Sequence, residues 1–242
     1  MRPRIVALGC TLAGALGLLT LPSAAVDAAT LPKAAIGVST AASYAYGATV
    51  RITVTLRDRM AGARVSLYAT PHGGKRTLVT TGKVDLAGKL YPHYKVTKAT
   101  TFTAVFPGDA KDAAVAASRA VTVRAKVTDA ITGYYKTTKV GGVTYRFYHG
   151  SATLTLKASV VPDKRGECLE PETEQYDSGT GWDADTKYGC DKLDRVSHDT
   201  APFTLSQAVG DRYRIRADYI RAAKDTANLS AAAPWLYFEV VK

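Results

Sequence analysis

The chain has 242 residues and carries 32 lysines and arginines against 21 aspartates and glutamates, a net charge of +11. Beyond the first 21 residues no apolar run is long enough to span a bilayer, which excludes a protein with several transmembrane helices. The remaining length suffices for two small domains or one large one.

The first residues have the layout of a secretory signal peptide. Arg2 and Arg4 precede an uncharged apolar run from Ile5 to Leu21, and a proline and small residues follow. We therefore predict that residues 1–29 are a signal peptide, that cleavage occurs near Ala25 to Ala29, and that the mature protein is secreted. A transmembrane anchor is not expected, because the apolar run is short and a cleavage pattern follows it at once.

Residues 30–126 alternate apolar and polar side chains over short segments. In "TVRITVTLR" the apolar residues occupy every second position, which indicates a strand buried on one face. Turn signals such as "PHGGK" and "PGDAKD" recur at short intervals, and no 3.6-residue apolar stripe interrupts them. The segment predicts an all-β sandwich of about seven strands.

Residues 127–242 continue in the same style with larger loops. "KVGG" separates two strand-like segments and predicts a hairpin, and "DRYRIRADYI" alternates inward apolar residues with Arg212, Arg214 and Arg216. Trp182 and Trp235 are the expected large core side chains. The fold class is therefore all-β: two tandem immunoglobulin-like β-sandwich domains, 30–126 and 127–242, after a signal peptide.

Cys168 and Cys190 remain once Cys10 is removed with the leader. In an exported chain an even cysteine count favours a disulfide, whereas zinc would need about four ligands and a redox pair would prefer CxxC spacing. The bridge would stabilise the fold by roughly 3 kcal/mol. Six acidic residues and a single lysine lie between the two cysteines, and we interpret the stretch as a stapled loop located where a third and fourth strand would be expected.

Calcium is an open alternative for this acidic stretch. Asp183 and Asp185 have useful spacing for an oxygen-ligated ion, but the segment fails the EF-hand pattern. We predict no metal and no cofactor.

The positive charge is confined to one half of the chain. Residues 30–126 contain 15 lysines and arginines against 4 acidic residues, and residues 127–242 contain 15 against 16. Ten of the basic residues fall on expected solvent faces and turns of the first domain: Arg51, Arg57, Arg59, Arg64, Lys75, Arg76, Lys83, Lys89, Lys95 and Lys98.

A domain of this charge attracts polyanions. The partners it predicts are an anionic cell-wall polymer such as a teichoic acid, or a surface glycan, with no specific nucleic acid. The other interpretation is that these residues only solubilise the domain and protect its sheet edges from aggregation.

Aromatic residues cluster in the hairpin that begins the second domain: Tyr134, Tyr135, Tyr145, Phe147 and Tyr148. Exposed, these rings would stack on sugars and make a carbohydrate-binding module. Packed inward, they would form core and cross-strand pairs.

No catalytic pattern is present. The four histidines are scattered, and GxSxG, HExxH and P-loop motifs do not occur. We predict that the protein is not an enzyme. A secreted inhibitor, or a small enzyme of unrecognised type, stays open as an alternative.

Residues 36–125 resemble the bacterial immunoglobulin-like domains of exported actinobacterial proteins. The resemblance rests on "YG" before the first long strand, "TTFTAVFPGDA" near the end, and a closing "AVTV". In residues 150–242 it rests on "GDRYRIRADY" and the final "W…F.V". It implies β-sandwiches used as spacers, stalks or binding modules, and it carries over no catalytic residues. The function expected is that of a secreted, non-catalytic binding or structural protein at the cell envelope.

Overall fold

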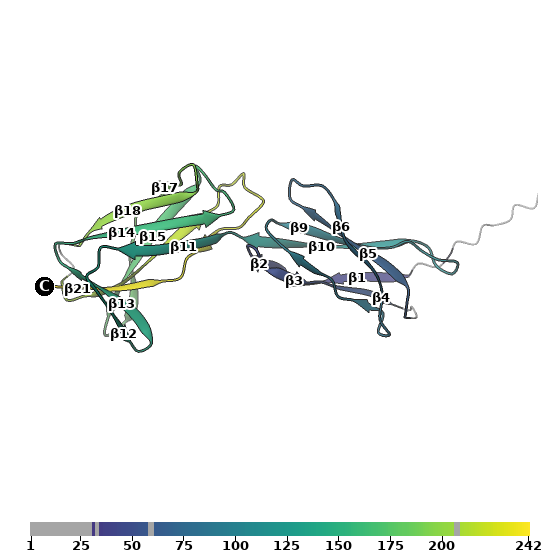
Figure 1. Cartoon of the computed structure of the whole chain (residues 1–242), viewed down its shortest axis with the longest axis horizontal. Helices are drawn as coiled ribbons and strands as arrows, with labels where there is room; N and C mark the ends of the chain where they lie inside the picture. The colour runs from purple at the N-terminus through teal and green to yellow at the C-terminus, as the bar shows by residue number, and fades with distance from the viewer. Residues whose placement is uncertain (1–30, 32–33, 58–60, 206–208) are drawn as a thin grey trace, which may run out of the picture. The chain divides into compact units, whose positions relative to one another are not determined.

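The computed structural model describes residue 31 and residues 34–57, 61–205 and 209–242, which form strands, turns and loops without a helix (Figure 1). The predicted signal peptide and Arg59 lie outside these residues. Within the described ranges there is no helix that could cross a membrane. The all-β prediction is confirmed.

The first sandwich has two layers. One layer is a sheet of three strands, listed in spatial order: β1 (Ala35–Ser39), β4 (Thr53–Arg57) and β7 (Lys89–Leu90). A short pair extends this layer: β3 (Thr49–Arg51) and β8 (His93–Lys95). The other layer has five strands, again in spatial order: β2 (Ser43–Ala45), β10 (Val115–Arg124), β9 (Thr100–Phe106), β5 (Arg64–Pro71) and β6 (Thr77–Lys83).

The predicted alternation explains this arrangement. Val50, Ile52, Val54 and Leu56 are all buried, while their neighbours in sequence face outward. Pro92 has no N–H to donate and lies between β7 and β8, where the ladder is interrupted. The Ile52 N–H still bonds to the Pro92 carbonyl at 2.9 Å, so the two segments stay together.

The second sandwich also has two layers. The smaller sheet contains, in spatial order, β11 (Lys126–Thr132), β14 (Thr153–Val161) and β18 (His198–Thr204), which run side by side in Figure 1. The larger sheet follows the order β12 (Lys136–Val140), β13 (Val143–His149), β21 (Leu236–Val241), β19 (Arg212–Ile220), β15 (Cys168–Asp177) and β16 (Gly181–Lys187). Two short strands attach to it: β17 (Asp191–Lys192) and β20 (Ala231–Ala232).

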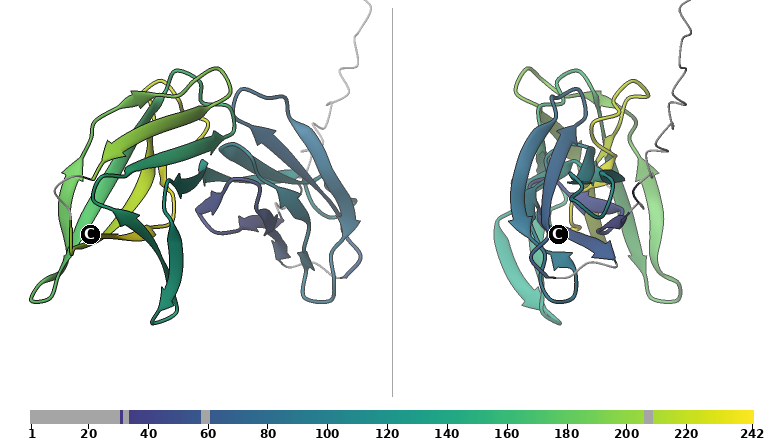
Figure 2. Two further views of the ribbon diagram at one scale, coloured as in Figure 1. Left: turned by 60° about the vertical axis from the view of Figure 1, so that its left-hand side comes forward. Right: turned by 90° about the vertical axis from the view of Figure 1, so that its right-hand side faces the viewer.

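The two sandwiches share one topology. In the smaller sheet of each sandwich, the first strand pairs antiparallel with the central strand: β1 with β4, and β11 with β14. In each, a strand of the larger sheet pairs in parallel with the last strand, as β2 with β10 and β13 with β21. Antiparallel strands split between two such sheets define an immunoglobulin-like sandwich. The second sandwich adds β12, whose turn to β13 projects from the sheet in Figure 2.

Each sandwich has its own hydrophobic core. The first is built around residues such as Leu67 and Phe102, and the second around Leu154, Tyr148 and Tyr219, all of which are fully buried. The prediction that Trp182 and Trp235 anchor the core is wrong, because both are partly exposed and absent from the core cluster. Tyrosines serve instead, since their hydroxyls reach polar partners: Tyr148 donates to the Thr132 carbonyl at 3.1 Å.

One acidic side chain connects the two layers of the second sandwich. Asp129 lies on β11, and its Oδ2 accepts a hydrogen bond of 3.1 Å from the backbone N–H of Ala217 on β19. Burial raises the pKa of Asp129 to about 6, although the hydrogen bond from Ala217 acts in the opposite direction. The charged form is therefore disfavoured in the folded protein.

This pKa predicts a loss of stability as the pH rises. The unfolded chain releases the Asp129 proton near the ordinary value of 3.8 and the folded protein near 6, so the folded state binds more protons between these values. Increasing the pH from 4 to 6 therefore removes stability, and Asp129→Asn, which keeps an oxygen acceptor, should weaken that decrease. Urea unfolding of both proteins at several pH values measures it; parallel pH profiles of the variant and the parent would contradict the assignment.

Candidate functional site

The acidic stretch is part of a sheet and not a loop. Residues 168–187 form the β15–β16 hairpin, and β15 lies between β16 and β19 in the larger sheet. The interpretation of the stretch as a loop is therefore wrong, although the disulfide that was expected to staple it is present. Its acidic residues alternate along β15, and those at positions 172 and 174 face arginines directly across the ladder.

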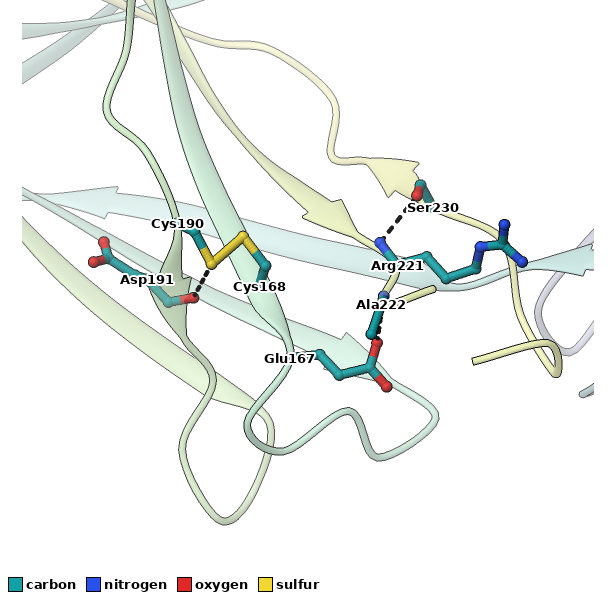
Figure 3. Close-up of a disulfide and its surroundings, with 7 residues drawn as sticks. All are labelled: Glu167, Cys168, Cys190, Asp191, Arg221, Ala222 and Ser230. Atoms are coloured by element: carbon teal, nitrogen blue, oxygen red, sulfur yellow. Dashed lines mark hydrogen bonds between the residues drawn. A yellow bond between two sulfur atoms is a disulfide. The ribbon is translucent and has the colours of Figure 1, made fainter. Parts of the chain in front are cut away.

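The disulfide between Cys168 and Cys190 is confirmed (Figure 3). Their Cα atoms are 5.2 Å apart, and the bridge joins the start of β15 to the segment that precedes β17. Beside it, the Glu167 carboxylate accepts the Ala222 N–H at 3.1 Å. The bridge thus fixes residues 188–191 against β15. Tyr188 and Asp191 of this segment also line a cavity.

The outer face of the larger sheet carries alternating arginines and tryptophans. The guanidinium carbon of Arg214 on β19 lies 4.8 Å from the ring centre of Trp182 and 4.5 Å from that of Trp235. The guanidinium carbon of Arg216 lies 4.2 Å from the ring centre of Trp235. Arg214 Nε bonds to Glu174 at 2.6 Å, and Arg216 Nη2 bonds to Glu172 at 2.6 Å. Stacking on aromatic faces together with planar pairing to carboxylates is the geometry that arginine favours.

These arginine–glutamate pairs across β15 and β19 use charges of the second sandwich alone. Every ion pair between residues that the structure describes lies in this sandwich, including the exposed pair of Arg212 with Glu239. The arginines of β19 are occupied by acids of the same sheet. They are therefore not available to a polyanion.

The basic residues of the first sandwich are placed differently. Nine of the ten predicted cations are described, and all of them lie on outward positions or turns, with Lys89 partly buried. They come from both layers: Arg51, Arg57, Lys89 and Lys95 from the smaller sheet and its extension, and Arg64, Lys75, Arg76, Lys83 and Lys98 from the larger sheet and its loops. The structure thus distributes them over the sandwich and does not gather them into one pocket.

Within this set, Arg64 on β5 lies directly opposite Lys83 on β6. Two like charges on neighbouring strands repel each other unless an anion lies between them. None of the nine cations forms an ion pair with another described residue; Arg51 and Arg76 instead stack on Tyr91 and Tyr68, at 4.1 and 3.9 Å from the ring centres. Their charge stays available to solvent or to a ligand.

The predicted aromatic hairpin exists as β12 and β13, but it does not present an aromatic platform. Tyr145 and Tyr148 are buried, and Phe147 is half-buried. Tyr134 and Tyr135 are exposed, and the Tyr135 ring stacks on His149 with 4.2 Å between centroids. Most of the cluster therefore serves the packing of the sandwich, and only two rings remain at the surface.

The histidines do not come together. His72 follows β5, and the others lie on β8, β13 and β18. Across the described part of the chain, no group of three or more histidine, cysteine, aspartate or glutamate side chains is placed to hold a metal ion. The Asp185 side chain, part of the calcium alternative, lies outside what the structure describes.

A cavity of about 720 Å³ opens between the two layers of the second sandwich. One wall is β18, the edge strand of the smaller sheet, and the facing wall comes from β15, β19 and β21 with the segment held by the disulfide. Its apolar lining includes Leu154, Phe203, Ile215 and Phe238. Its size falls in the range of about 300–1,000 Å³ found for small-molecule sites.

Two carboxylates line this cavity. Asp199 is on β18 opposite the inward-facing Ala158, so its side chain shares the inner face of the strand with Ala201 and Phe203. Its Oδ2 is buried and has no hydrogen-bond partner. Burial raises the pKa of Asp199, the backbone N–H of Thr200 acts in the opposite direction, and the negative charges of Asp191 and Asp194 raise the pKa further.

The arginine–glutamate pairs between β15 and β19 were not predicted from the sequence, and neither was the cavity. The alternation of Arg212, Arg214 and Arg216 was visible, and so was that of the glutamates of the acidic stretch, but their pairing needs the strand order. Asp199 alternates with Ala201 and Phe203, which is a detectable signal for an acid on an inward face.

Comparisons with known proteins give no family. Neither a protein-family model nor a curated protein matches the chain. Among solved structures, the sulfur carrier protein SoxY from Chlorobium limicola f thiosulfatophilum has 20% identity over 39% of this chain and 86% of its own, with a TM-score of 0.31. A marsupial T cell receptor has 11% identity over 84% and 72%, with a TM-score of 0.36. Escherichia coli alpha-2-macroglobulin activated by porcine elastase has 11% identity over 88% and 22%, with a TM-score of 0.35.

Proposed function

We propose that the protein is exported and acts without catalysis at the cell envelope, where its first sandwich contacts an anionic polymer. The observation that carries the proposal is the difference between the sandwiches in how charge is used. The second pairs the three arginines of β19 with its own acids, whereas the nine described cations of the first have no ion pair among the described residues. The predicted signal peptide and the disulfide support a location outside the cytoplasm.

Physical chemistry favours a long polymer over a small anion. Cations spread over two layers create a positive potential around a whole domain, and a flexible polyanion can follow such a surface. A single exposed contact contributes little, so many have to act together. Because the Debye length is about 8 Å at physiological ionic strength, such binding has to weaken as salt is added.

The first test measures co-sedimentation with purified teichoic-acid-bearing cell walls at about 50 mM and 500 mM salt. We expect binding at low salt and most of it lost at high salt. The double variant Arg64→Glu/Lys83→Glu, which reverses two facing cations on β5 and β6, should weaken binding by roughly ten-fold at low salt.

The matched control reverses two exposed lysines of the second sandwich, Lys139→Glu and Lys157→Glu, and changes the net charge by the same amount. It should bind nearly as well as the parent protein. Equal losses of binding in both double variants would mean that the net charge of the protein, and not the first sandwich, determines the binding. Binding that does not respond to salt would rule out the electrostatic proposal.

The absence of catalysis is part of the proposal, and scattered histidines and the missing nucleophile motifs support it. Carbohydrate binding through the aromatic hairpin is the second candidate, favoured by the exposed Tyr134 and Tyr135. A glycan array separates the two, because stacking on sugars does not require an anionic ligand. We further propose kinship with the bacterial immunoglobulin-like domain proteins, on the resemblance of residues 36–125 and the repeated strand order.

A further inference from the structure

We propose that the cavity between the layers of the second sandwich binds a small organic cation, a protonated amine attached to an apolar or aromatic body, with Asp199 as its anionic anchor. The site is separate from the polyanion-binding surface, which lies on the other sandwich. The proposal therefore goes beyond the function proposed above. It rests on three properties of the cavity: an unpartnered buried oxygen, aromatic side chains in a mixed polar and apolar lining, and a wall fixed by the disulfide.

The unpartnered oxygen comes first. A buried acceptor without a hydrogen bond destabilises a fold by about 1–3 kcal/mol, more when it is charged, so its presence requires an explanation. Asp199 Oδ2 is such an atom, on an inward-facing position of β18. An ammonium group donates up to three hydrogen bonds and brings the missing positive charge.

The charged side chains that line the cavity are both acidic. Asp191 also lines the cavity and is exposed, and with Asp194 it acts on Asp199 as a like charge. Among the described residues that line the cavity there is no lysine, arginine or histidine. An anionic ligand would be repelled, and a neutral one would leave the negative charge without compensation. The lining therefore selects a cation.

The rest of the cavity fits the body of such a ligand. Phe203 and Tyr188 form an edge-to-face pair with 4.8 Å between ring centroids, and Leu154 and Phe238 lie behind them among the lining residues. Aromatic faces attract cations as well as apolar groups, so they favour both parts of an amphipathic amine. Ligand sites typically combine such a lining with a few polar groups that fix orientation.

The wall opposite β18 is held in place covalently. Cys190 directly precedes Asp191 and is bonded to Cys168, and the Tyr188 N–H bonds to the Pro171 carbonyl at 3.1 Å. Both Tyr188 and Asp191 line the cavity. Preformed walls lower the entropic cost of binding, which gives the disulfide a role in the site beyond stabilising the fold.

The test uses isotope-labelled, oxidised protein without its leader and follows amide shifts by NMR during titration. The probes are 2-phenylethylammonium chloride and its neutral counterpart 2-phenylethanol, with 3-phenylpropionate as the anionic probe. We expect the ammonium to shift residues 188–191 and 199–204 and to bind roughly ten-fold more tightly than the alcohol, with the carboxylate weakest.

The variant Asp199→Asn should abolish the preference for the ammonium and leave binding of the alcohol within about two-fold. Asp183→Asn removes the same charge from an exposed position of β16 and should keep the preference. Equal binding of ammonium and alcohol by the parent protein, or a preference that survives Asp199→Asn, would overturn the proposal. The parent comparison decides by itself if the variant does not fold, and polyanion binding by the first sandwich is unaffected by either result.

Discussion

Replacing Lys164 by methionine is expected to lower the free energy of unfolding of the second sandwich by about 3–5 kcal/mol. Lys164 and Asp225 form an ion pair in which the side chains are 5% and 9% exposed. Methionine fills a similar volume but brings no charge, so the Asp225 carboxylate would stay buried without its cation. Leaving one member of a buried pair alone is far more damaging than losing an exposed pair.

Other groups also contact the Asp225 carboxylate. The Tyr219 hydroxyl lies 2.6 Å from Glu167 Oε2 and 3.1 Å from Asp225 Oδ2, and Asp225 Oδ1 accepts the Ala227 N–H at 2.8 Å. Burial acts to raise the pKa of Asp225, but Lys164 and this N–H outweigh it, and the pKa is lowered. Stability from the pair is therefore present at neutral pH and lost as the pH falls through the folded pKa.

Urea unfolding followed by tryptophan fluorescence measures the effect, because both tryptophans belong to the second sandwich. The matched control is Arg165→Met, the next residue along, whose pair with Asp163 is exposed on both sides; it should change stability little. The double variant Lys164→Met/Asp225→Asn should recover part of the loss, because it removes the isolated charge. A Lys164→Met variant as stable as Arg165→Met would show that the buried pair contributes no more to the free energy of unfolding than the exposed one.

Replacing Phe102 by alanine should destabilise the first sandwich by about 3–5 kcal/mol. Phe102 lies on β9, is 0% exposed, and packs edge to face against Tyr94 with 5.4 Å between ring centroids. Its removal takes apolar surface out of the core and leaves a cavity that the neighbouring strands fill only in part.

Two probes separate this effect from damage to the second sandwich. Far-ultraviolet circular dichroism detects strands of both sandwiches, whereas tryptophan fluorescence detects the second alone. Phe102→Ala should produce an earlier transition by circular dichroism and leave the fluorescence midpoint in place. The control Leu86→Ala truncates a side chain that is 93% exposed and should shift neither. A parallel shift of both probes would mean that the two cores unfold as one.

The strands were predictable because their signal is local. Along β4, β9 and β14 every second side chain is buried, which follows from the two-residue repeat of a strand and needs no knowledge of its partners. The disulfide was predictable for a similar reason, since the two cysteines that lie outside the predicted signal peptide offer one pairing.

The sites were less predictable because they depend on which strands become neighbours. The cation set of the first sandwich followed from composition, and the structure places its described members outward. The acidic stretch was misinterpreted as a loop because its charge suggested solvent, whereas β19 supplies arginines directly across from its glutamates. The tryptophans were assigned to the core on size, yet those same arginines hold them on the outer face.

By itself the sequence determined that this chain forms strands, carries its excess charge in one half and joins two cysteines, because periodicity, composition and count are properties of the chain alone. Tertiary structure decided the rest: that Lys164 meets Asp225, that β15 lies beside β19, and that Asp199 faces a cavity. These are contacts between residues tens of positions apart, and only the order of strands in two packed sheets brings such residues together.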